Sequence, residues 1–546
     1  MDDSLQDDTL AKDDLREHER LAQERAPYEG LWREIDERFP DAAGFDQKSP
    51  GSIRGERNFD ATHLIALERF AAAGVAITTP EERHYIRPVF EDADLMKLQS
   101  VKLWCQYAGQ RLYAIRHAMS TGFSVAANED WDQLGRYGTS PMWSAAIDGR
   151  GLIYRTLNLA ECCIDVDVAG IVDTVIRKMC RPVRQWEQLF GKDALTPKMQ
   201  KALADNKPQT EFEVLHIVRP NTSWDRDKYD WRGKPISSRY LAVDEKLFIR
   251  RGGFFTMPIS VSRHMTSPGE KYGRSPAIKM LPTIHGVNAM RHTTLRAGHK
   301  AVDPALLFFD DDGITSLSTK PGGLNAGLVD ESGRSLVQRM PGGEGALPWV
   351  SQDIENERAT IRTAFLEEFY KILTDPNSRM TTTEVLEVMA KQGVLVRPFA
   401  GRYAMEKQHP VSNRDLELAL RAGQIDPFPP EVVEAGAWPR IDYENPLAEM
   451  ARAQSTGKTL RYIEALQALA AVDATVVDTV DADAVARGMA EEIGVKPSYI
   501  RTEEDVAALR QARADAEQQA AGVEQLQGAS DAYLNVARAN QISEAA

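Results

Sequence analysis

The chain has 546 residues and a formal net charge of −15, with 42% hydrophobic and 27% charged residues. This length is too great for a single hydrophobic core and predicts two to four domains, and the composition excludes wholesale disorder. The acidic pI of about 5.3 argues against a protein that grips nucleic acid over its whole surface. Four cysteines without paired CxxC spacing predict neither a disulfide scaffold nor a zinc site, and favour a reducing compartment.

The N-terminal half begins with a polar, acidic segment, residues 1–20, which is expected to be a frayed tail. It has no apolar stretch of the signal-peptide type, and no run of 18 apolar residues occurs anywhere, so neither a secretion signal nor a membrane span is predicted. Apolar residues at helical spacing then predict helices over 24–40, 62–80 and roughly 92–120.

From about residue 135 the sequence changes to a strand pattern, and the β-rich middle is taken to span about 121–270. Residues 211–221 (EFEVLHIVRPN) alternate apolar and polar side chains, and similar short runs are separated by turn residues such as Ala169-Gly170. Two short helices are expected within this part, at PVRQWEQLFG and TPKMQKALAD. The middle is therefore predicted to be rich in β-structure.

The segment 271–302 stands out in an acidic chain because it contains no acid. Ser275 can cap a helix and Pro276 suits the first helical position, so a long helix is predicted from there. Three histidines recur at every seventh residue, which places them near one face but about 10 Å apart, too far to share one metal ion. The basic residues and the histidines are Lys271, Arg274, Lys279, Arg291, Arg296, Lys300, His285, His292 and His299.

The remaining chain is predicted to be loops and then helices. Residues 303–350 are rich in glycine, proline and aspartate, as loops are, and helices are expected over 353–374 and 381–396. From about 414 onwards the sequence is almost entirely helical in pattern, and the sequence TEED at 502–505 has the form of a capping box at a helix start.

Two short motifs suggest enzyme chemistry. STGKTL (455–460) resembles the end of a phosphate-binding loop, but Arg452 occupies the position where the motif needs glycine, and the surrounding sequence is helical. FDDDG (309–313) offers carboxylates for a metal ion, although a glycine-closed acidic turn explains it better. Neither motif by itself establishes an activity.

Six segments, in the same order along the chain, resemble the head-to-tail connecting, or portal, proteins of short-tailed tailed bacteriophages. The resemblance covers roughly residues 20–515 and rests on the ordered set, since no single segment is specific. Two departures occur, GVAITTP where the family often has a GLTSP-like segment, and Thr383 where alanine often precedes the glutamate. The six segments are ERAPYEGLW (24–32), ALERFAAAG (66–74), RYGTSPMW (136–143), EFEVLHIVRPN (211–221), EKYGRSPAIKMLPTIHGVNAM (270–290) and MTTTEVLEVM (380–389).

This resemblance implies an α+β subunit of the portal type that assembles as a ring of identical copies, twelve in the family. Each subunit would have a mixed helix and strand wing, a helical stem, a small clip and a C-terminal helical crown. The implied segments are a disordered tail (1–20), wing (21–270), stem helix (271–302), clip (303–339), tunnel loop (340–352), wing or core helices (353–413), crown (414–530) and frayed tail (531–546).

The resemblance also implies a function without enzymatic activity or cofactor. The ring would occupy one vertex of the capsid in the virion, pass double-stranded DNA during packaging and ejection, and be assembled in the host cytoplasm away from membranes. The implied partners are further copies of the chain, double-stranded DNA, the terminase large subunit, a tail adaptor, and the major capsid and scaffolding proteins. The alternatives are another virion structural protein, such as a capsid or tail subunit, and less favoured, a nucleotide- or metal-dependent enzyme.

Two sets of site residues follow from the resemblance. DNA must slide through the ring, so tight binding would be a defect, and each phosphate that a basic residue neutralises adds affinity. A ring that is acidic overall and carries basic residues only at selected heights would therefore bind the DNA weakly. The basic stem residues, which face either DNA in the channel or acids of the next subunit, are Lys279, Arg291, Arg296 and Lys300. The channel-facing tunnel loop, for which an ordinary surface turn is the alternative, would hold Gly342, Gly343, Glu344, Gly345 and Trp349.

Overall fold

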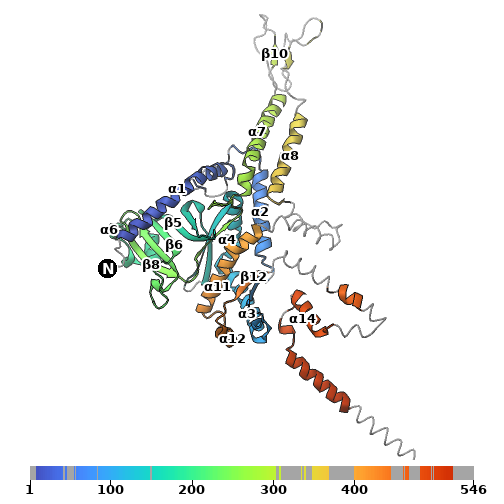
Figure 1. Cartoon of the computed structure of the whole chain (residues 1–546). Helices are drawn as coiled ribbons and strands as arrows, with labels where there is room; N and C mark the ends of the chain where they lie inside the picture. The colour runs from blue at the N-terminus through green and yellow to red at the C-terminus, as the bar shows by residue number, and fades with distance from the viewer. Residues whose placement is uncertain are drawn as a thin grey trace, which may run out of the picture. The chain divides into compact units, whose positions relative to one another are not determined.

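The computed structural model of the chain is α+β, as predicted, with long helices around antiparallel sheets (Figure 1). It divides into two compact units, the first comprising Met1–Ile86, Arg111–Ile425 and Tyr443–Leu447, and the second Arg87–Gln110, Asp426–Asp442 and Ala448–Ala546. The structure describes residues 8–40, 44–45, 55, 57–82, 84–147, 151–302, 306–308, 332, 334, 337–339, 347–367, 399–443, 459, 461–466, 480–493, 495 and 497–519.

The first helix of unit 1, α1 (Asp8–Arg38), includes most of the segment that was predicted to be a frayed tail. That prediction was wrong for residues 8–20, because this acidic stretch is held by a buried ion pair. Asp14 is fully buried, and its carboxylate accepts a hydrogen bond from Arg239 at 2.8 Å and lies 3.2 Å from Arg219. Burial raises the pKa of Asp14, and the surrounding arginines oppose that rise. A polar, acidic segment such as residues 8–20 can therefore form a helix that packs on the body of the protein.

A five-stranded antiparallel sheet forms one part of unit 1, in the order β4-β5-β6-β7-β8. One face packs against apolar residues of α1, including Leu21, and the other against α5 and α6, including Trp186. The alternating segment 211–221 is strand β6, as predicted. The elements are β4 (Cys162–Val166), β5 (Val172–Pro182), α5 (Val183–Phe190), α6 (Pro197–Ala204), β6 (Glu211–Pro220), β7 (Ile236–Ala242) and β8 (Leu247–Phe254).

A second sheet of three strands, in the order β3-β2-β9, lies with α2 and α4 in the same unit. The helix α4 was not predicted, because its residues fell within the part read as β-rich. It packs closely on α2, and Trp131 of α4 stacks on Tyr403. The elements are α2 (Thr62–Thr78), α4 (Phe123–Tyr137), β2 (Thr139–Ile147), β3 (Gly151–Thr156) and β9 (Ile259–Arg263).

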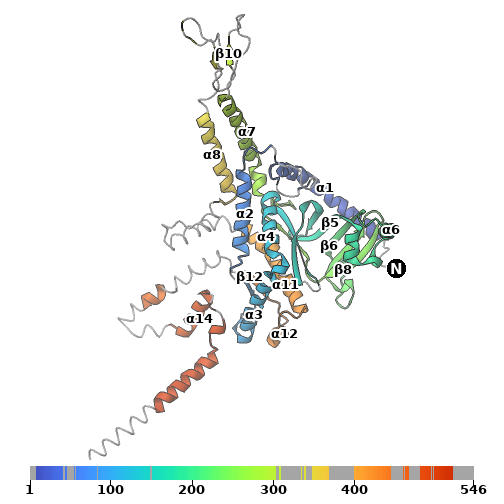
Figure 2. The same ribbon diagram turned by 180° about the vertical axis from the view of Figure 1, so that it is seen from behind.

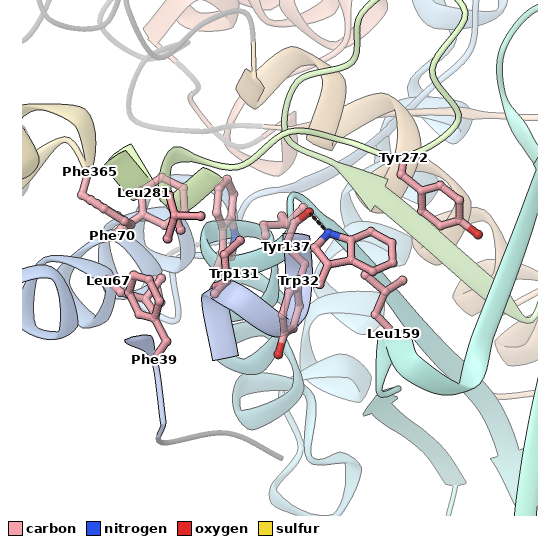
Figure 3. Packing of buried hydrophobic residues seen from close by; sticks show 14 of the residues in the cluster. Trp32, Phe39, Leu67, Phe70, Trp131, Tyr137, Leu159, Tyr272, Leu281 and Phe365 are labelled. Atoms are coloured by element: carbon pink, nitrogen blue, oxygen red, sulfur yellow. Dashed lines mark hydrogen bonds between the residues drawn. The ribbon is translucent and has the colours of Figure 1, made fainter. Parts of the chain in front are cut away.

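The largest hydrophobic cluster joins segments from one end of unit 1's sequence to the other. Figure 3 shows Trp32 of α1 beside Tyr137 at the end of α4, with the Trp32 indole N–H donating to the Tyr137 carbonyl oxygen at 3.3 Å. Leu281 and Phe365, which follow much later in the chain, lie in the same cluster. This cluster fixes the N-terminal helix, α4 and the long helix beginning at Pro276 against one another.

The chain is helical over residues 399–421, with a π-helical turn η8 (Ala404–Gln408) leading into α11 (His409–Arg421). The consecutive polar residues Glu406, Lys407 and Gln408 of this turn are all buried. In a regular α-helix, three consecutive side chains point in directions that cover more than half of the helix circumference. Glu406 accepts hydrogen bonds from the backbone and guanidinium of Arg263, and Lys407 pairs with Asp130 at 2.8 Å. The wider π turn is therefore fastened by buried ion pairs.

Unit 2 contains the first part of α3 (Gln99–Arg116) and most of the C-terminal elements. The Trp104 indole donates to the Asp426 carbonyl oxygen at 3.0 Å, and its ring lies 4.8 Å from that of Phe428. The predicted helix start at 502 is confirmed, since the Thr502 hydroxyl accepts from the Asp505 amide at 3.1 Å. The predicted crown boundary between 413 and 414 falls inside α11, whereas the units divide between Ile425 and Asp426.

The other elements are short turns and single helices or strands. Strands β1 and β12 pair with each other. Their bounds are β1 (Ile86–Val89), η2 (Leu95–Lys97), η3 (Met119–Thr121), η4 (Leu159–Glu161), η5 (Lys192–Ala194), η6 (Trp231–Gly233), α12 (Pro430–Ala435), β12 (Arg440–Tyr443), α14 (Ala482–Ile493) and η10 (Pro497–Tyr499).

Replacing Lys407 by methionine should destabilise unit 1 strongly. The substitution leaves the Asp130 carboxylate buried without its partner and removes the donor to the carbonyl oxygens of Ser140 and Ser260. Breaking one partner of a buried pair costs about 3–5 kcal/mol. Chemical denaturation followed by tryptophan fluorescence measures this loss, and Met405→Ala, at a half-exposed position of the same turn, is the control expected to stay within about 0.5 kcal/mol. Equal stability of the two variants would show that the buried pair does not hold the turn.

Candidate functional site

Two long helices, α7 (Pro276–Val302) and α8 (Leu347–Ala364), lie side by side as a hairpin in unit 1 (Figures 1 and 2). Both views show β10 beyond the far end of the helices. Strands β10 (Leu306–Phe308) and β11 (Val337–Arg339) pair antiparallel, with Leu307 opposite Gln338. The start and end of the predicted clip segment are therefore adjacent.

The base of α7 is capped as the sequence predicted. The Ser275 hydroxyl accepts a hydrogen bond from the Ile278 amide at 2.9 Å and donates to the Arg136 carbonyl oxygen at 2.7 Å. The Ser275 side chain thus gives a hydrogen-bond partner to an amide of the first helical turn, which has no partner within the helix, and it also joins the start of α7 to the end of α4.

Two Tyr-Gly pairs meet directly before this cap. A Cβ atom on Gly273 would lie 2.1 Å from the carbonyl oxygen of Gly138, and one on Gly138 would lie 2.6 Å from the carbonyl oxygen of Gly273. Gly138 also has φ of 77°, and the Gly273 amide donates to the Thr139 hydroxyl at 2.8 Å. Only glycine at both positions lets the two backbones pass at this distance.

The inner face of α7 is fixed by packing and by one amide side chain. Leu281 and Ile284 are buried in the same cluster as Ile361 of α8 and Phe365 directly after it. Asn288 accepts a hydrogen bond from the Phe59 amide at 2.7 Å and donates to the Arg57 carbonyl oxygen at 2.8 Å. The direction of the first half of α7 is therefore determined by the body of unit 1.

The three histidines of α7 have separate surroundings. His285 lies 3.6 Å from a carboxylate oxygen of Glu34, His292 stacks on Phe59 with ring centroids 4.4 Å apart, and His299 is exposed. The described residues contain no group of three histidine, cysteine or acidic side chains that could hold a metal ion. None of the helices within the described ranges is long and apolar enough to cross a membrane.

The four predicted basic residues of α7 do not share one environment. Arg291 is half-buried, whereas Lys279, Arg296 and Lys300 are exposed. The Lys279 ammonium lies 3.0 Å from the Met265 sulfur, and no carboxylate of the described residues forms an ion pair with any of the four. In contrast, Arg358 of α8 donates to Asp60 at 2.5 Å.

The Asp60 carboxylate anchors α8 to the start of α2. It accepts a hydrogen bond from the Thr62 amide at 2.9 Å as well as from Arg358. Burial works to raise the pKa of Asp60, but these hydrogen bonds outweigh it and the pKa is lowered. The charged carboxylate is therefore the form that this contact stabilises.

The predicted tunnel loop needs a correction. Helix α8 begins at Leu347 and ends at Ala364, whereas the sequence predicted a helix over 353–374 with a loop over 340–352. Pro348 in the first turn favours this earlier start, because proline is tolerated where the amide has no helical partner. Trp349 thus lies in the first turn of α8, with 73% of its surface exposed. Gly342, Gly343, Glu344 and Gly345, like FDDDG and nearly all of STGKTL, lie outside the described residues.

The described residues form an α+β subunit whose body holds a long helical hairpin, and no described acid forms an ion pair with the lysines and arginines of α7. The chain belongs to the family of bacteriophage head-to-tail connecting proteins, which it matches over residues 12–500. The resemblance found in the sequence is therefore confirmed, and it places this chain among the proteins that connect phage heads to tails.

Two relatives match nearly the whole chain. A protein of Bordetella phage BPP-1 described as "Probable portal protein" is 27% identical over 512 residues, covering 92% of this chain and 90% of the relative. The "Portal protein" of Salmonella phage epsilon15 is 24% identical over 521 residues, with the same coverage. Among solved structures, a chain from the neck of an empty GTA particle matches 73% of this chain and 86% of its own length, with 12% sequence identity. The TM-score is 0.33, and we draw no conclusion from this match.

Substitution of Gly273 by alanine should destabilise the junction below α7 by roughly 3 kcal/mol, because its Cβ would meet a backbone oxygen that cannot move aside. Gly286→Ala is the matched control within α7. No atom lies within 4 Å of its added Cβ, and alanine favours a helix by about 1 kcal/mol. Denaturation midpoints of the unassembled chain should move in opposite directions for the two variants. A Gly273→Ala midpoint equal to that of the parent would mean that the two backbones are not held together.

Proposed function

We propose that the chain is a phage portal protein, a ring of copies at one vertex of the capsid that joins head to tail and surrounds the path of double-stranded DNA. The family match and the two relatives described as portal proteins support this function. The observation that carries it is the α7–α8 hairpin, anchored at its base by buried contacts and carrying the acid-free helix. A ring with twelve copies and a DNA channel is the form we propose from the resemblance.

Within this ring, the hairpin would be the stem and the segment between β10 and β11 the clip. The clip would face the terminase large subunit during packaging and the tail adaptor afterwards, while the body of unit 1 would be the wing. The major capsid and scaffolding proteins would surround the ring during assembly in the host cytoplasm, before the portal becomes part of the virion. No enzymatic step is assigned to the chain, and the terminase would supply the work of packaging.

Electron microscopy of the purified full-length protein tests the ring directly. We expect rings of about twelve copies with a central hole, since a head-to-tail contact between identical subunits closes when its rotation permits. Native mass measurement gives the number of copies independently. Stacked tubes or closed shells would instead identify another virion structural protein, and ATP hydrolysis lost in a Lys458→Ala variant would identify an enzyme.

Deletion of residues 342–345 tests the role proposed for the glycine-rich segment before α8. If this segment faces the channel, the deletion removes a contact with DNA but no contact between subunits. Rings should therefore form in normal yield, while DNA packaging or retention falls. Substitution of the same four residues by Gly-Ser-Gly-Ser keeps the length and serves as control for the connection itself. Failure of ring assembly in the deletion variant would show that the segment serves assembly instead.

A further inference from the structure

We propose that Lys407 and Asp130 condense with each other to form an amide bond between their side chains, so that the folded chain is covalently closed within unit 1. Asp130 belongs to α4 and Lys407 to the π-helical turn η8. The step takes place within one copy of the chain and goes beyond the portal function, on which it does not depend.

The two side chains are shielded from water and already in contact. Only 3% of the Lys407 side chain and none of the Asp130 side chain is exposed, and the Lys407 nitrogen lies 2.8 Å from Oδ1 of Asp130. This oxygen accepts no hydrogen bond from any other group among the described residues. The nitrogen is therefore close to the separation from the carboxyl carbon, about 3–3.5 Å, at which aligned groups react.

Two backbone carbonyl groups orient the nitrogen of Lys407. It donates to the Ser140 carbonyl oxygen at 3.1 Å and to the Ser260 carbonyl oxygen at 3.0 Å, and its third direction faces Asp130. An ammonium group fills all three directions with hydrogen. An amine would keep its two N–H groups on the carbonyl oxygens and direct its lone pair at Asp130. The site thus orients the neutral amine for attack.

Burial favours the uncharged form of the pair. It lowers the pKa of Lys407, and the charges of Asp130 and Glu406 oppose this shift without cancelling it. Transfer of one proton from the ammonium to the carboxylate removes two buried charges at once and leaves an amine and a carboxylic acid. A desolvated lysine amine is a nucleophile. Glu406 does not compete as a partner, because its carboxylate is held by Arg263 at 2.6 Å.

Two hydroxyl groups lie beside the carboxyl group that would be attacked. The Ser262 hydroxyl is 3.4 Å from Oδ2 of Asp130, and Tyr403 is hydrogen-bonded to the same carboxylate. Burial raises the pKa of Tyr403 well above its usual value, and the charge of Asp130 raises it further, so the phenol stays protonated as a donor. Donors to a carboxyl oxygen stabilise the negative charge that develops there when the carbon is attacked.

The atoms of the step balance without a further reactant. The bond between Nζ of Lys407 and Cγ of Asp130 forms, and the bond between Cγ and Oδ1 breaks. Two of the three ammonium hydrogens leave with Oδ1 as one water molecule, and the third stays on the amide nitrogen. Oδ2 becomes the amide oxygen, within reach of the Ser262 hydroxyl. An uncharged amide thereby replaces two buried charges.

The identity of the cation distinguishes this pair from its neighbours. Two further ion pairs among the described residues are buried to a similar extent, Arg116 with Asp415 and Arg263 with Glu406. A guanidinium group remains charged in proteins, so it offers no nucleophilic lone pair, whereas a buried lysine readily becomes neutral. Of these three buried pairs, the one that contains Lys407 is therefore the one that can condense.

The mass of the purified full-length protein, measured after denaturation, tests the bond. We expect the main species to be lighter than its sequence requires by one water molecule. In a tryptic digest, the peptide containing Lys407 should be joined to the peptide containing Asp130, with no cleavage after Lys407, because its amine has become an amide. A main species with the full sequence mass and an unlinked Lys407 peptide would overturn the proposal.

The same digest contains a matched control. Lys271 lies 2.6 Å from Asp165, closer than the buried pair, but both side chains are partly exposed. Partial burial acts to lower the pKa of Lys271, but its hydrogen bonds to Asp165 and Glu24 outweigh this effect and the pKa is raised. The Lys271 peptide should therefore be recovered unlinked. Linkage of both pairs to the same extent would mean that contact alone joins peptides during handling, and would overturn the proposal.

The substitution Lys407→Arg separates the covalent bond from the ion pair. It keeps a positive charge facing Asp130 but removes the nucleophilic amine, so this variant should show the full mass of its own sequence. Water loss that persists in the variant would arise elsewhere in the chain and would overturn the proposal. If the variant does not fold, the linked peptide of the unmodified chain still decides the question.

Discussion

The structure depends on the crossing of two backbones at Gly138 and Gly273. These residues lie 135 positions apart, yet neither position has room for a Cβ. The crossing brings the end of α4 to the start of α7, where the Ser275 hydroxyl joins the two. Since α7 departs from this point, the direction of the whole hairpin is set by a contact that only glycine permits.

Buried charges hold the surrounding body in register. Helix α1 is fixed to the sheet by Asp14. The helical segment 399–421 is fixed by the ion pairs of Glu406 with Arg263 and of Lys407 with Asp130. Burial lowers the pKa of Lys407, and the facing Asp130 carboxylate opposes that shift. Such pairs contribute little net stability compared with apolar packing, but a shifted register would leave each charge unpaired. They therefore select one arrangement of helices around the sheets.

The sequence predicted what depends on local pattern. The β-rich middle, the cap at Ser275 and the helix from Pro276 follow from alternation, capping chemistry and proline preference, and the structure confirms them. The ordered resemblance also identified the family correctly. These features could be read from neighbouring residues or from known relatives.

The errors arose where distant residues decide the structure. The docking of residues 8–20 requires arginines more than 200 positions away, and α4 acquires its place by packing on α2. The early start of α8 carried a local signal, Pro348, which the glycine-rich context obscured. For the candidate site, sequence identified all four basic residues of α7, but it could not show that Arg291 is half-buried while the other three are exposed.

The acid-free helix is best understood from the way this chain treats its other cations. Two buried arginines of the described body, Arg116 and Arg263, are each matched by a buried acid, Asp415 and Glu406 respectively. The chain has a surplus of 15 acidic charges, yet no acid among the described residues forms an ion pair with a lysine or arginine of α7. A surface left basic in an acidic protein is one whose partner is supplied from outside the single copy. In the ring of identical subunits proposed above, the surplus acid of the neighbouring copies would be the nearest source of such a partner.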